Sequence, residues 1–127
     1  MKINRIDHLV LTVRDIDLTC AFYSRVLGMR VITFGSGRRA LGFGKQKINL
    51  HQLGHLFPPH AEFPTPGSAD LCLILDTPLQ EALQHLRACN VNIIEGPVPR
   101  SGAAGAIASI YIRDPDQNLI EISEVQS

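Results

Sequence analysis

The stretch Asp7-His8-Leu9-Val10-Leu11 reappears in the second half of the chain as Ala69-Asp70-Leu71-Cys72-Leu73. Both stretches alternate apolar and polar side chains, which is typical of a β-strand with one buried face. Ile48-Asn49-Leu50 reappears in the same way as Ile120-Glu121-Ile122. The chain is therefore predicted to be an internal repeat of two similar modules. The second pair of segments is spaced more widely than the first, and we expect a longer loop, from Gly96 to Ala106, to absorb the difference.

The first half is predicted to fold as a strand, a helix and three further strands. Asp15 can cap a helix that ends at Gly28. Its apolar stripe is expected to be Leu18, Phe22 and Val26, widened by Ala21 and Leu27. Short apolar runs separated by glycines then predict strands over residues 29–34, 38–43 and 47–53.

The second half repeats this order after a connection, residues 54–68, that carries four of the eight prolines. Thr77-Pro78-Leu79-Gln80 has the form of a capping box, and the helix that it begins is expected to end at Asn90. The apolar stripe of this helix is Leu79, Ala82, Leu83 and Leu86. Three more strands are predicted over residues 91–95, 108–113 and 118–125.

Two βαβββ modules, about residues 5–53 and 69–125, predict an α+β fold. Neither module can bury a sheet face alone, so we expect them to pair as a single domain, residues 1–127, in a curved mixed sheet with the helices outside. Alternation then directs the apolar strand residues toward the helices and the polar ones into a shared cup. The predicted cup residues are His8, Asp70, Glu121 and either Asn49 or His51.

Composition excludes several classes of function. Twelve basic and twelve acidic residues cancel, and there is no basic stripe with interleaved aromatic residues, so neither nucleic acid nor an anionic membrane is an expected partner. No apolar run approaches the roughly 20 residues of a spanning helix, and a cytoplasmic protein that handles small molecules is expected. The three cysteines are expected to be reduced thiols, and Cys72 fits a cup wall better than a nucleophile.

An imidazole and carboxylates at one site are ligands that divalent Zn, Ni, Mn, Co or Fe accept. Charged side chains inside a cup are costly unless they are paired or bound to a metal. The sequence therefore predicts one divalent metal ion held by His8, Asp70, Glu121 and His51 or Asn49. Taken singly, each of these residues also fits an ordinary strand end or a solvated position.

Three segments resemble the vicinal oxygen chelate superfamily, which includes glyoxalase I, extradiol dioxygenases, fosfomycin resistance thiol transferases and bleomycin resistance proteins. They are residues 6–13 (IDHLVLTV), 22–29 (FYSRVLGM) and 114–121 (DPDQNLIE), and the similarity covers nearly the whole chain. Residues 48–51 (INLH) and 96–103 (GPVPRSGA) resemble a narrower group, the glyoxalase domain-containing protein 5 family.

The resemblance implies paired βαβββ modules, a metal bound by residues of the first and last strands of each module, and often a homodimer. By position it implies His8, Asp70 and Glu121 as ligands, and Asn49 holds the remaining position. His51, one strand repeat further along the same face, is the alternative to Asn49. Glyoxalase I typically carries glutamate at the position of Asn49 and often histidine at that of Asp70.

The leading hypothesis is a metal-dependent lyase or isomerase that resembles glyoxalase I, a lactoylglutathione lyase-like metalloenzyme. Its substrate would be a small molecule with two neighbouring oxygens, such as the hemithioacetal of methylglyoxal and glutathione. The metal would polarise the carbonyl and stabilise an enediolate, while Glu121, as ligand and catalytic base, would move a proton between adjacent carbons.

Arginines are the expected anchors for a substrate carboxylate, because a guanidinium group binds it with two hydrogen bonds. The candidates are Arg100, Arg38 and Arg39. For Arg38 and Arg39 an ordinary solvated surface charge is favoured. Asn49 is a further candidate substrate-binding residue.

Two other functions stay open on the sequence alone. His8, His51 and Glu121 would form the 2-His-1-carboxylate set of an extradiol-type Fe(II) dioxygenase, although such enzymes more often carry additional modules. A non-enzymatic protein that binds or sequesters a small molecule, as resistance proteins do, would need the cup and not the metal. Asn49, a weaker metal ligand than a carboxylate, favours that second alternative.

Overall fold

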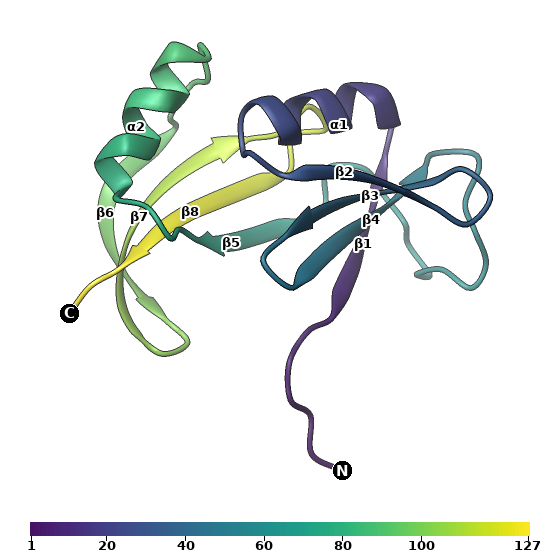
Figure 1. Cartoon of the computed structure of the whole chain (residues 1–127), viewed down its shortest axis with the longest axis horizontal. Coiled ribbons are helices and arrows are strands. Elements are labelled where there is room, and N and C mark those ends of the chain that lie inside the picture. The colour runs from purple at the N-terminus through teal and green to yellow at the C-terminus, as the bar shows by residue number, and fades with distance from the viewer. The chain divides into compact units, whose positions relative to one another are not determined.

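The computed structural model describes residues 1–127, which form two compact units, Met1–Gly67 and Ser68–Ser127. Each unit is one four-stranded sheet with one helix (Figure 1). The first unit contains β1 (His8–Val13), α1 (Ile16–Arg25), β2 (Arg30–Phe34), β3 (Arg38–Phe43) and β4 (Gln46–Gln52). The second contains β5 (Asp70–Ile74), α2 (Leu79–Ala88), β6 (Glu95–Gly102), β7 (Gly105–Arg113) and β8 (Leu119–Val125). The predicted α+β class and βαβββ order are confirmed.

The two sheets have the same strand order. It is β1-β4-β3-β2 in the first unit and β5-β8-β7-β6 in the second. The first and last strands of each unit pair in parallel, and the other pairs are antiparallel. Val10 lies opposite Asn49, and Cys72 lies opposite Glu121. The pairing of the first and last strands therefore has the same register in both units, and Asn49 and Glu121 occupy equivalent positions.

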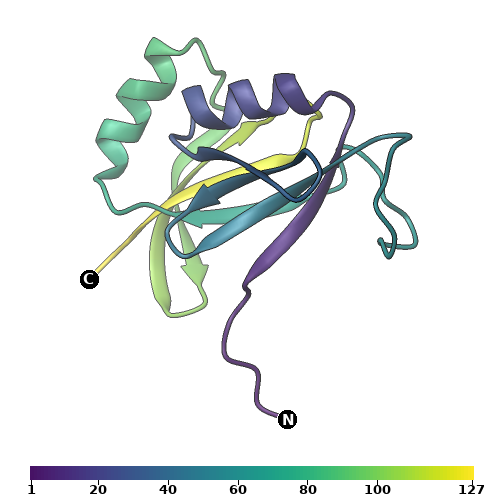
Figure 2. The ribbon, with the colours of Figure 1, turned by 45° about the vertical axis from the view of Figure 1, so that its right-hand side comes forward.

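Alternation along the strands gives each sheet a helix-covered face and an open face, as the turned view also shows (Figure 2). Apolar side chains that are nearly inaccessible fill the helix-covered faces. They are Leu11, Val13, Ile48 and Leu50 in the first unit and Ile110, Ile112, Ile120 and Ile122 in the second. The open face of the first sheet carries His8 and Asn49, and that of the second carries Asp70 and Glu121. The predicted division of the strand residues between two faces is confirmed within each unit.

Helix α1 begins and ends as predicted but packs on a different face. The Asp15 side chain accepts a hydrogen bond from the backbone N–H of Leu18, and Gly28 follows the helix with a φ of +67°. The side chains that α1 buries are Thr19, Cys20, Tyr23 and Val26, whereas Leu18 is 55% exposed. Val26 is thus buried as predicted, whereas Leu18 is wrong as a core residue: the buried face is shifted by about one residue, roughly 100° around the helix.

Helix α2 buries Leu79, Leu83 and Leu86, as predicted, and Asn90 follows it with a φ of +58°. The predicted capping box at Thr77 is wrong: the cap residue is Pro78, and no side-chain capping bond forms. The backbone N–H of Leu79 instead donates to Glu124 Oε1 of β8 at 2.9 Å. The sheet thus satisfies one of the free N–H groups at the start of the helix. Neither helix is long and apolar enough to cross a membrane.

The predicted strand over residues 91–95 and the predicted loop from Gly96 to Ala106 are both wrong. Strand β6 covers most of that loop and forms an antiparallel hairpin with β7. Two prolines, Pro97 and Pro99, argued against a strand, but β6 is an edge strand, where a missing N–H costs no bond in the sheet. The extra length of the second module is therefore a longer hairpin.

The turn between β7 and β8 is a buried polar network. Asp114 Oδ1 accepts hydrogen bonds from the backbone N–H groups of Asp116 and Asn118, each at 2.9 Å. Asn118 Nδ2 donates to Asp114 Oδ2 at 2.8 Å, and Asn118 Oδ1 accepts from the N–H of Ala69 at 2.8 Å. Asn118 thereby ties the start of β8 to the start of β5. This attachment stabilises the register that puts Glu121 opposite Cys72.

We expect Asn118→Ala to lower the free energy of unfolding by about 2–3 kcal/mol, because it removes one hydrogen-bond donor from Asp114 Oδ2 and the side-chain acceptor of the Ala69 N–H. Urea unfolding followed by circular dichroism measures this change. Gln117→Gly is the matched control, since the exposed Gln117 already has a φ of +72°, which glycine adopts freely. A loss below about 0.5 kcal/mol for Asn118→Ala would show that the network does not hold the turn.

Candidate functional site

A depression of about 450 Å³ lies on the open face of the second unit. Its lining consists of Asp70, Ile94, Glu95, Arg100, Tyr111, Arg113, Leu119 and Glu121. Three residues that the sequence singled out, Asp70, Arg100 and Glu121, are therefore brought together. The lining is mainly polar and carries both signs of charge, which suits a small polar ligand better than an apolar one.

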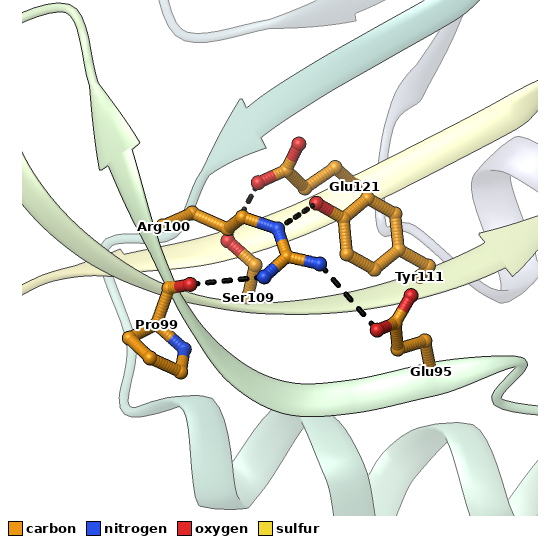
Figure 3. Close-up of polar contacts among 6 residues, drawn as sticks. All are labelled: Glu95, Pro99, Arg100, Ser109, Tyr111 and Glu121. Carbon is orange, nitrogen blue, oxygen red and sulfur yellow. Dashed lines mark hydrogen bonds and ion pairs between the residues drawn. The ribbon is translucent and has the colours of Figure 1, made fainter.

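Buried hydroxyl groups orient the Glu121 carboxylate. Ser109 Oγ donates to Glu121 Oε2 at 2.6 Å (Figure 3). Ser123 Oγ lies 3.4 Å from the same oxygen and 2.7 Å from Ser109 Oγ. Both serines are fully buried, while Glu121 is half-buried. One carboxylate oxygen is thus fixed from within the sheet. Both serine contacts go to Oε2, so Oε1 is the oxygen that they leave for a ligand, an ion or a proton.

Cys72 lies beside this group and interacts with it. Its Sγ lies 3.4 Å from Ser123 Oγ. Partial burial, and to a smaller extent the negative charge of Glu121, raise the pKa of the Cys72 thiol. Cys72 therefore stays a thiol at neutral pH, which supports the interpretation of a wall residue over a nucleophile.

The Arg100 side chain is held in place by three acceptors. Its Nε donates to the Tyr111 hydroxyl at 2.9 Å, one terminal nitrogen donates to the Pro99 carbonyl at 3.0 Å, and the other lies 3.5 Å from Glu95 Oε1 (Figure 3). The hydrogen bond to Tyr111 raises the pKa of Arg100. Arg100 is therefore a fixed cation beside the depression.

An irregularity in β6 brings Glu95 and Arg100 to the same face. Glu95 lies opposite Tyr111 and Val98 lies opposite Ser109, so β6 has one residue more than β7 in this interval, which is a β-bulge. Without the bulge, residues five apart in a strand would point to opposite faces. Gly96, inside the bulge, has a φ of +105°, and an added Cβ would lie 2.4 Å from the Ser109 carbonyl oxygen. Only glycine fits there.

In the first unit, His8 carries its own orienting partner. His8 Nδ1 lies 2.9 Å from Asp7 Oδ2. This hydrogen bond lowers the pKa of Asp7, so the carboxylate stays charged. The pair leaves Nε2 as the free nitrogen of His8. Metal-binding histidines commonly have such a carboxylate on the far side of the ring.

Asn49 and His51 are buried on the same face of β4, with 6% and 3% of their surface exposed. Asn49 Oδ1 and His51 Nδ1 are both buried and have no hydrogen-bond partner. Burial, followed by the positive charge of Arg38, lowers the pKa of His51, so its imidazole is neutral. Buried polar atoms are normally paired, and these two are therefore suited to a ligand or an ion.

The register of β1 and β4 distinguishes these two candidates. His8 lies opposite Lys47, so Asn49 is about 7 Å and His51 about 13 Å further along the strands from the level of His8. A metal ion binds its ligands at about 2 Å. Asn49 is thus near enough to share an ion with His8, whereas the distance to His51 is long for two imidazoles on one ion.

The other two arginines belong to the first unit and are not part of the depression. Arg39 faces α1 and pairs with Asp17 at 3.2 Å. Arg38 lies on the open face and packs against Phe34 and Phe57. The Nε atoms of both arginines are buried. The sequence favoured a freely solvated charge for both arginines. The structure differs, because neighbouring side chains cover the Nε end of each one.

No group of three or more His, Cys, Asp or Glu side chains gathers in this structure. The predicted ligands are divided between the units, with His8 and Asn49 in the first and Asp70 and Glu121 in the second. The donors themselves fit a divalent ion: one oriented imidazole, one unpaired amide oxygen and two carboxylates.

Sequence reasoning missed the partners of the two charged groups in the depression. Ser109 and Ser123 orient Glu121, and Tyr111 and Glu95 hold Arg100. A signal for Ser109 was present, since it is a small polar residue inside the apolar run 107–112. The Glu95–Arg100 pair had no such signal, because it depends on the bulge.

The sequence matches the glyoxalase/bleomycin resistance protein/dioxygenase superfamily over residues 5–122. It is 58% identical to virulence protein STM3117 of Salmonella typhimurium, over 98% of this chain and 86% of that protein. It is 52% identical to glyoxalase domain-containing protein RDO1 of Mycosarcoma maydis, over 99% of this chain and 71% of that protein. The crystal structure of STM3117 matches with a TM-score of 0.98 at 57% identity, covering 99% of this chain and 100% of the other.

Two more distant structures share the fold alone. A lactoylglutathione lyase from Agrobacterium tumefaciens matches with a TM-score of 0.73 at 22% identity, covering 97% of this chain and 95% of the other. TnmS3, an antibiotic binding protein from Streptomyces, matches with a TM-score of 0.78 at 20% identity, covering 99% of each chain. On the match of nearly its whole length, the chain belongs to the glyoxalase/bleomycin resistance protein/dioxygenase superfamily.

Proposed function

We propose that this protein is a metal-dependent lyase or isomerase resembling glyoxalase I, which moves a proton between adjacent carbons of a small substrate with two neighbouring oxygens. The hemithioacetal of methylglyoxal and glutathione is a substrate of this class. The observation that supports the proposal most is the Glu121 carboxylate, which Ser109 holds by one oxygen beside a depression that also contains Arg100.

Glu121 is the proposed catalytic base. Ser109 occupies Oε2, so Oε1 is the oxygen that takes a proton from one substrate carbon and returns it to the neighbouring carbon. The electron pair of the broken C–H bond stays within the substrate, and the two oxygens carry the charge in between. No oxidant or reductant is needed, which matches a site that offers a base and a cation.

His8, Asp70, Glu121 and Asn49 are the proposed ligands of a divalent Zn, Ni, Mn, Co or Fe ion. When bound, the ion supplies Lewis-acid stabilisation for negative charge on the substrate oxygens. The Asp7–His8 pair and the unpaired Oδ1 of Asn49 support this assignment. The strand register favours Asn49 over His51 as the fourth ligand. The same register argues against the extradiol alternative, which needs both His8 and His51 on one Fe(II).

Arg100 is the proposed anchor for a substrate carboxylate. Tyr111 and Glu95 fix the guanidinium before any ligand arrives, so little side-chain freedom is lost on binding. Assignment to the narrower glyoxalase domain-containing protein 5 group and a homodimeric assembly are also part of the proposal. The 52% identity to RDO1, itself named for a glyoxalase domain, supports the narrower group.

Small-molecule binding without catalysis is the second candidate function. It is favoured by the unpaired buried atoms of Asn49 and His51, which a ligand can satisfy without a metal. The fold is compatible with both functions, since it occurs in a lactoylglutathione lyase and in an antibiotic binding protein.

We expect Glu121→Gln to reduce turnover of the methylglyoxal–glutathione hemithioacetal by about 10³-fold, because the amide cannot accept the proton. Formation of the thioester product, followed by its ultraviolet absorbance, gives the rate. Glu81→Gln, which removes an exposed carboxylate of α2 in the same unit, is the control and should keep the wild-type rate. Unchanged turnover in Glu121→Gln would remove Glu121 from the mechanism. If the wild-type protein forms no product, this hemithioacetal is not its substrate.

Arg100→Ala should raise KM for the same substrate about tenfold and change kcat by less than about threefold, because a carboxylate anchor binds ground state and transition state alike. Steady-state kinetics separates the two constants. Arg113→Ala, which removes another cation from the lining of the depression, is the matched control and should leave KM within about twofold. Equal effects of the two substitutions on KM would mean that the depression attracts the substrate only by its overall charge.

A further inference from the structure

Cations and aromatic rings gather on the open face of the first unit. The guanidinium carbon of Arg38 lies 4.6 Å from the ring centroid of Phe57 and 5.0 Å from that of Phe34. Lys47 Nζ lies 4.0 Å from the Phe34 centroid. We call Phe34, Arg38, Lys47 and Phe57 the cation–aromatic cluster. None of its members is a proposed metal ligand or base.

Two like charges, Arg38 and Lys47, meet at the Phe34 ring of this cluster. Lys47 belongs to β4 and Phe34 to β2, with β3 between them, so the Lys47 side chain crosses the face of β3 to reach the ring. The ammonium group thus arrives at the same ring that contacts Arg38. His8 is the main cause of the lowered pKa of Asp7, and the charge of Lys47 contributes to a smaller extent. The ion pairs of Asp7 are with Arg5 and His8, and Asp17 pairs with Arg39, so neither carboxylate forms an ion pair with Lys47 or Arg38. Like charges repel, and an anion bound between them would remove that cost.

The Nε atom of Arg38 is buried and has no hydrogen-bond partner. Contact with two rings leaves only the edge of the guanidinium plane for hydrogen bonding. A carboxylate meets such an edge with two parallel N–H···O bonds, a geometry that a lysine cannot provide. The edge of the Arg38 guanidinium is therefore a preformed binding site for a carboxylate.

The surroundings of the cluster add two further features. Asn49 Oδ1 and His51 Nδ1 are buried and unpaired on the same face, and the His51 ring meets Phe57 edge to face, with 5.6 Å between centroids. The two phenylalanine rings supply apolar surface that a simple inorganic anion would not use. The combination suits a molecule that has both a carboxylate and a flat apolar body.

We propose that the cation–aromatic cluster binds an organic carboxylate with a planar apolar body, of which an aromatic carboxylate is the simplest example. The carboxylate lies at the edge of Arg38 with Lys47 as the second cation, and the apolar body packs against Phe34 and Phe57. The site goes beyond the proposed function, because it needs neither a metal ion nor Glu121.

Benzoate is the probe for this site. We would titrate the ¹⁵N-labelled full-length protein and its His8→Ala/Glu121→Ala variant with benzoate and follow the backbone signals and the Arg38 Nε–H by NMR. We expect saturable shifts at the cluster in both proteins, with a Kd on the order of 1 mM for so small a ligand. Benzamide, which has the same shape without the charge, should bind at least about tenfold more weakly. Because the double variant lacks two proposed ligands and the base, binding to it is independent of the lyase proposal.

Matched variants locate the binding. Arg38→Gln should weaken benzoate about tenfold or more, whereas Arg39→Gln, one residue away on the opposite face, should stay within about twofold. Phe57→Leu, a substitution at a residue that is 40% exposed, should weaken benzoate without disturbing the sheet and replaces Arg38→Gln if that variant does not fold.

Three results would overturn the proposal. The first is a wild-type spectrum without saturable shifts at the cluster, and the second is equal binding of benzoate by the wild type and Arg38→Gln. The third is inorganic phosphate shifting the same signals with the affinity of benzoate, since the site would then recognise charge alone. Weak or absent phosphate binding beside saturable benzoate binding supports the organic carboxylate.

Discussion

In each unit the first strand pairs in parallel with the last strand. This pairing fixes which polar side chains share a level of the sheet, and it puts Asn49 and Glu121 at equivalent places in the two repeats. In the second unit this pairing is secured by Asn118, which bonds to Asp114 in its own turn and to Ala69 just before β5. The segment 114–121, which resembles the superfamily signature, therefore combines a structural turn with the proposed catalytic carboxylate, Glu121, three residues after Asn118.

The two units satisfy their polar side chains in different ways. In the second unit, Glu121 and Arg100 each have protein partners that fix their orientation beside one depression. In the first unit, Asn49 and Arg38 have buried polar atoms without partners. A preorganised base and cation support catalysis, because no reorganisation is needed when charge develops. Unpaired buried atoms support ligand binding, because a ligand removes their desolvation cost. We therefore propose catalysis for the open face of the second unit and ligand binding for that of the first.

Alternation predicted the fold and the position of the candidate residues on the open faces, because a strand with one buried face has a strict period of two. Features set by tertiary contacts could not be predicted in the same way. The buried face of α1 differs from the Leu18 stripe, since Cys20 and Tyr23 pack on the sheet in its place. β6 was not predicted, because it contains Pro97 and Pro99. These prolines are tolerated because the strand lies at the edge of the sheet. The bulge at Gly96 then creates the Glu95–Arg100 pair, and Lys47 reaches Phe34 across a neighbouring strand. Neither contact leaves a local pattern in the sequence.

The proposed metal site is best tested by measuring the metal content of the protein. Elemental analysis of anaerobically purified, untagged protein would be compared with the His8→Ala/Glu121→Ala variant, which removes one proposed ligand from each unit. We predict about one divalent transition-metal ion per chain in the wild-type protein and none above background in the variant. A wild-type protein without metal above the level of the variant, even after reloading with Zn, Ni, Mn, Co and Fe, would contradict this prediction.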